Sequence, residues 1–134
     1  MRRSLPQPIA FRLASLLTAI NVVVAAGFAV LGVIAPGNVL PAGEAPNNAS
    51  FLFALYAAAR AVPLAAFTLV AIYRRTLSSL LLLGALAGIV QFLDAGVGLV
   101  QGDLGKAIGP LIIAVLQMFA LWRVSFVKQR PRPS

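Results

Sequence analysis

Four long runs of apolar residues, separated by short polar or Gly- and Pro-containing segments, make up most of this 134-residue chain. At about 1.5 Å per residue, runs of this length can cross the roughly 30 Å hydrocarbon core of a bilayer. Very short connections after the second and third runs make their flanking helices antiparallel neighbours. We therefore predict one all-α membrane domain, 1–134, folded as an antiparallel bundle of four transmembrane helices at about 9–35, 50–73, 77–100 and 107–127, with a basic tail at 128–134.

Composition agrees with a membrane location. The chain is 60% hydrophobic and only 10% charged, with a mean hydropathy of +0.95. Soluble domains carry about 25% charged residues. The first run is far longer than the apolar core of a signal peptide, which has about 7–15 residues, so we expect a retained helix.

The basic residues predict the orientation of the bundle. Lys106 alone falls on one side of the predicted spans. Nine basic residues fall on the other side, namely Arg2, Arg3, Arg12, Arg74, Arg75, Arg123, Lys128, Arg130 and Arg132. An excess of Lys and Arg marks the cytoplasmic side. Both termini are therefore expected in the cytoplasm, with the protein in the cell's inner membrane and its basic ends against membrane lipids.

Several function classes find no support in the chain. Cysteine and histidine are absent, which excludes thiol chemistry, disulfides and the usual zinc sites. The three acidic residues, Glu44, Asp94 and Asp103, are too few and too scattered for a metal site or a carboxylate pair. No nucleotide-binding motif occurs, and the basic residues at helix ends do not form a nucleic-acid face. We predict no metal, no cofactor and no nucleic-acid partner.

Polar side chains inside the predicted spans are the candidate site. Counted from the helix ends, Arg60 and Asp94 lie about 15 and 9 Å below the outer surface, so a pair between the second and third helices is feasible. Such residues are costly in hydrocarbon and are often functional. The candidate ligand-binding or polar intramembrane site consists of Asn21, Tyr56, Arg60, Gln91, Asp94 and Gln117.

Helical phase predicts which faces turn inward. On the third helix a face of small and polar residues is expected inside, and a face of large apolar residues is expected against lipid. The inner face comprises Gly84, Ala87, Gly88, Gln91, Asp94, Ala95 and Gly98, and the lipid face comprises Leu82, Leu86, Ile89, Leu93, Val97 and Val100. On the second helix, the face predicted to line the interior comprises Phe53, Tyr56, Arg60, Leu64 and Phe67.

Each polar feature also has a structural interpretation. The Arg60–Asp94 pair could fix helix order as a salt bridge or could bind a ligand or proton. The three amides, Asn21, Gln91 and Gln117, could simply hydrogen-bond between helices. Their similar depth is what favours a functional site.

The second, third and fourth helices carry a pattern that resembles the DoxX-like family of small four-helix bacterial membrane proteins. The pattern consists of Tyr56-Ala-Ala-Ala-Arg60, then Arg74-Arg75, then the segment GALAGIVQFLD at 84–94 and a short Gly-containing turn. The resemblance implies a four-helix fold, with Arg60 and Asp94 at the family's intramembrane polar positions. It also implies a link, known for some members, to quinone or sulfur redox systems as membrane subunits.

Three functions follow as hypotheses. The first is a binding or accessory module that holds a lipid-like or quinone-like molecule, or that docks on a larger membrane complex. The partners expected are membrane lipids, a hydrophobic small molecule, and a homo-oligomer or larger membrane complex. The second is a proton-coupled small-molecule transporter, which with four helices would need a dimer. The third is a membrane enzyme acting on a lipidic substrate. It is the least favoured, because no nucleophile–base pair is visible.

Overall fold

The structure, a computed structural model, describes residues 7–128, and its regular structure in that range is entirely helical. A short 3₁₀ helix, η1 (Pro36–Asn38), follows the first of four α-helices. These are α1 (Gln7–Ile34), α2 (Asn48–Tyr73), α3 (Leu77–Val100) and α4 (Leu104–Lys128). The all-helical prediction is confirmed, and Arg2, Arg3 and the predicted tail beyond Lys128 lie outside the described residues.

Side chains at the helix starts explain where two of the helices begin. Asn47 and Ser50 form a reciprocal capping box at the start of α2, in which each side chain accepts a hydrogen bond from the other residue's backbone N–H. Helix α4 begins three residues earlier than predicted. Asp103 Oδ1 accepts a hydrogen bond from the backbone N–H of Lys106 at 3.1 Å, which satisfies a donor that the helix start leaves free.

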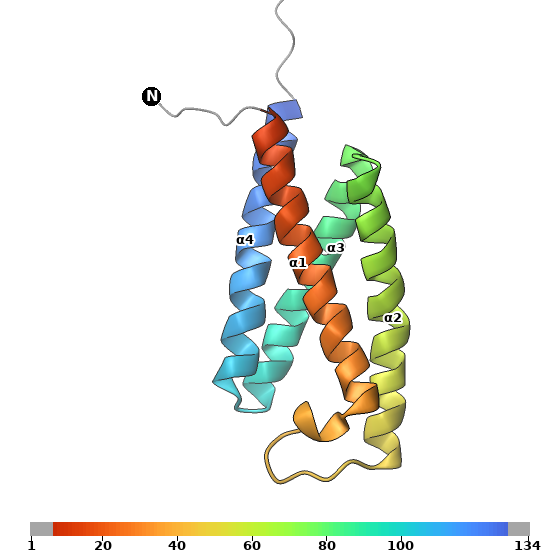
Figure 1. Ribbon diagram of the computed structural model, residues 1–134. Coiled ribbons are helices and arrows are strands. Elements are labelled where there is room, and N and C mark those ends of the chain that lie inside the picture. The colour runs from red at the N-terminus through yellow and green to blue at the C-terminus, as the bar shows by residue number, and fades with distance from the viewer. Residues whose placement is uncertain (1–6, 129–134) are drawn as a thin grey trace, which may run out of the picture.

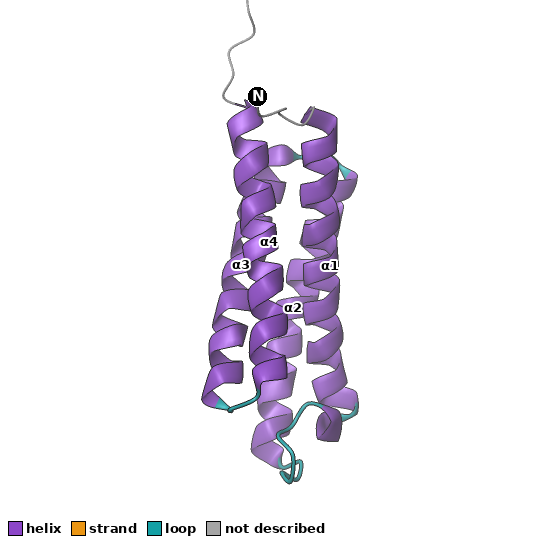
Figure 2. Cartoon of the chain, turned by 90° about the vertical axis from the view of Figure 1, so that its left-hand side faces the viewer, coloured by secondary structure: helices purple, strands orange, loops and turns teal. Residues whose placement is uncertain are grey.

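The four α-helices form a bundle whose connections lie at alternate ends (Figure 1). The loop after α1 and the α3–α4 turn lie at the lower end, and the α2–α3 connection lies at the upper end (Figure 1). The most extensive contacts join α3 to α4 and α1 to α2, and α2 does not touch α4. Figure 2 shows the neighbouring α3 and α4 from the side, with α1 beside them. The bundle thus consists of two helical hairpins packed against each other.

The tightest contact is inside the second hairpin. A Cβ built on Gly98 of α3 would come within 2.5–2.6 Å of the backbone of Lys106 and Ala107 on α4. Only a residue without a side chain allows two helices to approach this closely. Gly98 therefore sets the spacing of α3 and α4 near their connecting turn.

Buried apolar residues concentrate toward the upper end and the middle of the bundle. One cluster at the upper end is made by Ala10, Ala14, Leu80, Leu121 and Val124, and Ile72 packs against it, so that all four helices contribute. A smaller cluster in the middle is made by Val22, Ala65 and Ala87. Nearer the lower end, α2 has no fully buried residue before Ala65.

The outside of the bundle is apolar. All four α-helices are long and apolar enough to cross a membrane, and large hydrophobic side chains are exposed along each of them. Lipid tails solvate such side chains as well as a protein core does. The fold is that of a four-helix, multi-pass membrane protein.

Candidate functional site

Three of the predicted site residues meet inside the bundle. Asn21 of α1, Gln91 of α3 and Gln117 of α4 are 1%, 4% and 0% exposed. Gln91 Nε2 donates to Asn21 Oδ1 at 2.5 Å, and Asn21 Nδ2 donates to Gln117 Oε1. Gln117 Nε2 donates in turn to the backbone carbonyl of Gly84 at 2.5 Å. We call these three side chains with the Gly84 carbonyl the amide chain.

The amide chain is the polar link between the two hairpins. Asn21 belongs to the first hairpin, and both glutamines belong to the second. Each hydrogen bond of this kind contributes about 0.6–2 kcal/mol inside a membrane. Because each donated bond ends on an acceptor within the bundle, the amide chain holds the bundle together without a ligand. The three amides meet inside the bundle, and their contacts are those of the structural interpretation.

Three buried hydroxyl groups lie on the same interior and were not singled out from the sequence. They are Ser15 and Thr18 of α1 and Thr68 of α2, and none has a hydrogen-bond partner among the described residues. Thr18 lies against the amide chain, since a Cβ on Gly84 would come within 3.3 Å of its Oγ1. The spacing of three residues from Ser15 through Thr18 to Asn21 could have identified this stripe.

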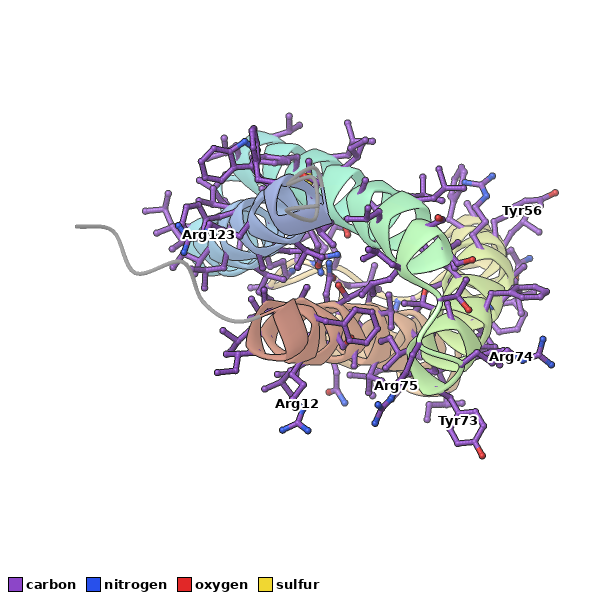
Figure 3. All side chains as sticks on the ribbon, turned by 90° about the horizontal axis from the view of Figure 1, so that it is seen from above. Arg12, Tyr56, Tyr73, Arg74, Arg75 and Arg123 are labelled. Carbon is purple, nitrogen blue, oxygen red and sulfur yellow. The ribbon has the colours of Figure 1, made fainter. Side chains whose placement is uncertain are left out.

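The prediction that Tyr56 and Arg60 line the interior is wrong. Both are exposed, as are Phe53 and Phe67 of the same predicted face. In Figure 3, Tyr56 points away from the bundle. The Arg60 guanidinium lies over the Tyr56 ring, 5.9 Å from its centroid, which is within the range of a cation–π contact. The residues that α2 buries are Ala65, Thr68 and Ala71 instead.

Asp94 is also exposed, and it is the exception on an otherwise correctly predicted face of α3. The other six residues of that face are buried, and the six residues predicted to face lipid are exposed. Asp94 forms no ion pair with Arg60. Among the side chains that the structure describes, those of residues 9–126, there is one ion pair, between Lys106 and Asp103. The predicted Arg60–Asp94 pair is therefore not made within the chain.

Arg60 and Asp94 belong to α2 and α3, two helices that contact each other. Leu64 of α2 packs against the middle cluster that contains Ala87 of α3. Arg60 is one turn before Leu64 and Asp94 is two turns after Ala87, on nearly the same helix faces. Because α2 and α3 are joined at the upper end, Arg60 lies nearer the lower end than Leu64 does, and Asp94 lies nearer the lower end than Ala87 does (Figure 1). We call Ala57, Arg60 and Asp94, all three exposed, the seam surface.

A second polar group ties the lower ends of the two hairpins together. Lys106 Nζ lies 3.4 Å from Asp103 Oδ2 and donates to the carbonyl of Val39 at 3.2 Å. The backbone hydrogen bond from Lys106 lowers the pKa of Asp103, and the Lys106 side chain adds to this effect. The described residues hold no group of three or more metal-ligating side chains.

Apart from Arg60, the described basic residues lie toward one or the other end of the bundle. Arg12, Arg74, Arg75 and Arg123 lie toward the upper end, and Lys106 lies at the lower end (Figures 1 and 3). Comparison with protein-family models, with curated proteins and with solved structures gives no match.

Proposed function

We propose that this protein is an accessory membrane subunit that docks on a membrane-embedded protein partner through the seam surface. In this proposal the helices cross the cell's inner membrane in antiparallel order. The partner covers Arg60 and Asp94 and supplies the opposite charges that the chain itself does not place against them.

The observation that carries the proposal is the exposure of two opposite charges at membrane depth. Arg60 lies twelve residues from the start of α2, and Asp94 lies six residues from the end of α3. A charged side chain near the bilayer centre costs about 2.5–3.5 kcal/mol on insertion scales. Charged residues in membrane spans usually face protein or water, so their exposure here points to a surface that another protein covers.

An enclosed ligand site receives less support. Such a site would need the six predicted residues around one cavity, whereas they divide into the buried amide chain and the outward-facing Tyr56, Arg60 and Asp94. A lipid-like or quinone-like molecule on the seam surface is the competing occupant. A proton-coupled transporter requires an acid on an interior pathway, and Asp94 is exposed on the outside of the bundle. A lipid-modifying enzyme is less favoured because no nucleophile–base pair is visible.

The proposed orientation follows from the charges at the two ends. Four described arginines lie toward the end that carries the α2–α3 connection, and only Lys106 lies toward the other. The positive-inside rule places the arginine-rich end, and with it both termini, in the cytoplasm. Cytoplasmic anionic lipid would also favour this end. Membership of the DoxX-like family, with its membrane subunits, would be compatible with this proposal and stays a prediction.

Site-specific photo-crosslinking in native membranes tests the docking. A photoreactive amino acid replaces Ala57, which is exposed one turn from Arg60, and in a control it replaces Leu116 on α4, which does not contact α2. The expected result is a protein adduct from position 57 that is lost in Asp94→Asn, and only lipid adducts from position 116. Lipid adducts alone from both positions would overturn the proposal in favour of a lipid-like occupant.

A further inference from the structure

We infer that the partner at the seam surface is a second copy of this chain, related by a two-fold axis along the membrane normal. Arg60 of each copy pairs with Asp94 of the other. The inference rests on the proposed docking function and names its partner.

The charges of the seam surface are self-complementary. Among residues 7–128, Arg60 and Asp94 are the only charged side chains more than five residues from both ends of a helix. They are one cation and one anion, both exposed, and no ion pair within the chain uses either. A two-fold interface brings residue i of one subunit to residue j of the other and j to i. Two copies therefore make two identical pairs and leave no unpaired charge.

The depths of the two residues permit this pairing. Two copies in one membrane share their orientation, so a residue can pair only with a residue at nearly the same depth. Measured from the middle cluster, Arg60 lies about 6 Å along α2 from Leu64, and Asp94 lies about 10 Å along α3 from Ala87, at 1.5 Å per residue. Both displacements run toward the lower end of the bundle (Figure 1). The remaining difference is within the reach of the long arginine side chain.

The surroundings of Arg60 suit a helix–helix contact. Ala57 presents a small side chain one turn away, which lets a neighbouring backbone approach closely. The Tyr56 ring lies beneath the guanidinium, with 5.9 Å between the guanidinium carbon and the ring centroid. The ring thus restricts the arginine side chain before the partner binds, which lowers the entropy cost of binding. The first half of α2, which has no fully buried residue, gains a packing partner in the dimer.

Charge reversal in separate copies tests the inference. In Arg60→Asp both membrane positions carry acids, and in Asp94→Arg both carry bases, so neither variant can pair with itself. A mixture of the two restores both pairs between unlike copies. The double variant Arg60→Asp/Asp94→Arg restores them between identical copies. Dimerisation is measured by energy transfer between labelled chains in phosphatidylcholine vesicles, and circular dichroism checks that each variant is folded.

We expect the wild type to dimerise and each single variant to lose at least tenfold in dimer affinity. The equimolar mixture and the double variant should recover most of it. Glu44→Arg, a charge reversal in the exposed loop before α2, serves as the matched control and should dimerise like the wild type.

Two outcomes would overturn the inference. If the double variant dimerises while the mixture of single variants does not, the pair forms within one chain. If the wild type is monomeric in vesicles, the partner is not a second copy. In that case crosslinking from position 57 decides separately whether a different protein docks there, so the proposed function can survive the failure of the dimer.

Discussion

Helix α3 has one buried face along nearly its whole length, from Leu80 to Gly98, whereas the buried residues of α2 are Ala65, Thr68 and Ala71, all in its second half. Helix α3 packs against α4 down to their shared turn, whereas α2 packs mainly against α1. The inner face of α3 is thus covered by other helices of the same chain, whereas the first half of α2 leaves a surface that another protein can cover.

The two helices follow the same rule for what they bury. Most of the buried residues of α3, and Ala65 and Ala71 of α2, are Gly or Ala, while phenylalanines and leucines face outward. In a membrane, burying a large apolar side chain gains little because lipid is equally apolar, whereas small residues allow close backbone contact. Residue size, more than hydrophobicity, distinguishes the inside of this bundle from its outside.

The largest expected effect is at Gly98, where α3 is most tightly packed. Gly98→Ala places a Cβ against the backbone of Lys106 and Ala107, which cannot move aside as a side chain would. We expect the free energy of unfolding to fall by about 3 kcal/mol or more, the upper end of overpacking costs. Equilibrium unfolding in detergent micelles measures this. Gly96→Ala, where nothing lies within 4 Å, is the matched control and should be neutral or slightly stabilising.

A smaller effect is expected where α2 becomes buried. Ala65→Leu inserts three heavy atoms into the middle cluster beside Val22 and Ala87 and should cost about 1–3 kcal/mol. Ala66→Leu, on the exposed side of the same helix, should change stability by less than about 0.5 kcal/mol. Equal costs in the same unfolding assay would contradict the assignment of the buried face of α2.

The amide chain should contribute about as much or somewhat less. Asn21→Leu removes the residue that joins Gln91 and Gln117, and it leaves the Nε2 donor of Gln91 and the Oε1 acceptor of Gln117 without their partners. We expect a loss of about 1–2 kcal/mol. Gln101→Leu, an exposed amide at the end of α3, is the control. A functional assay that loses all activity in a stably folded Asn21→Leu protein would instead indicate that the amide chain binds a ligand.

The smallest effect concerns the turn that ends α3. Because the pKa of folded Asp103 lies below its ordinary value of 3.8, its contribution to stability is present above that pH and is lost as pH falls through the folded-state value. We therefore expect a slightly lower melting temperature for Asp103→Asn at pH 7, and a difference from the wild type that vanishes in strong acid. A difference that grows on acidification would contradict the hydrogen bond to the helix start.

Periodicity and composition alone predicted the helices, their membrane-spanning length and the two faces of α3. The three interior amides were also predictable, because each is a polar residue well inside a long apolar run. Such inferences depend on local spacing and on the cost of polar groups in hydrocarbon, both of which a sequence carries directly.

Only the tertiary structure decided which face of α2 turns inward and that Arg60 and Asp94 do not pair. Nearly every face of α2 is apolar, so periodicity could not distinguish lipid from core. The face of α2 that turns inward is instead the one on which Ala65 packs against Val22 of α1 and Ala87 of α3. Whether two charges meet depends on how two helices are rotated and splayed, which no single helix encodes. Here both charges lie on the outside of the bundle.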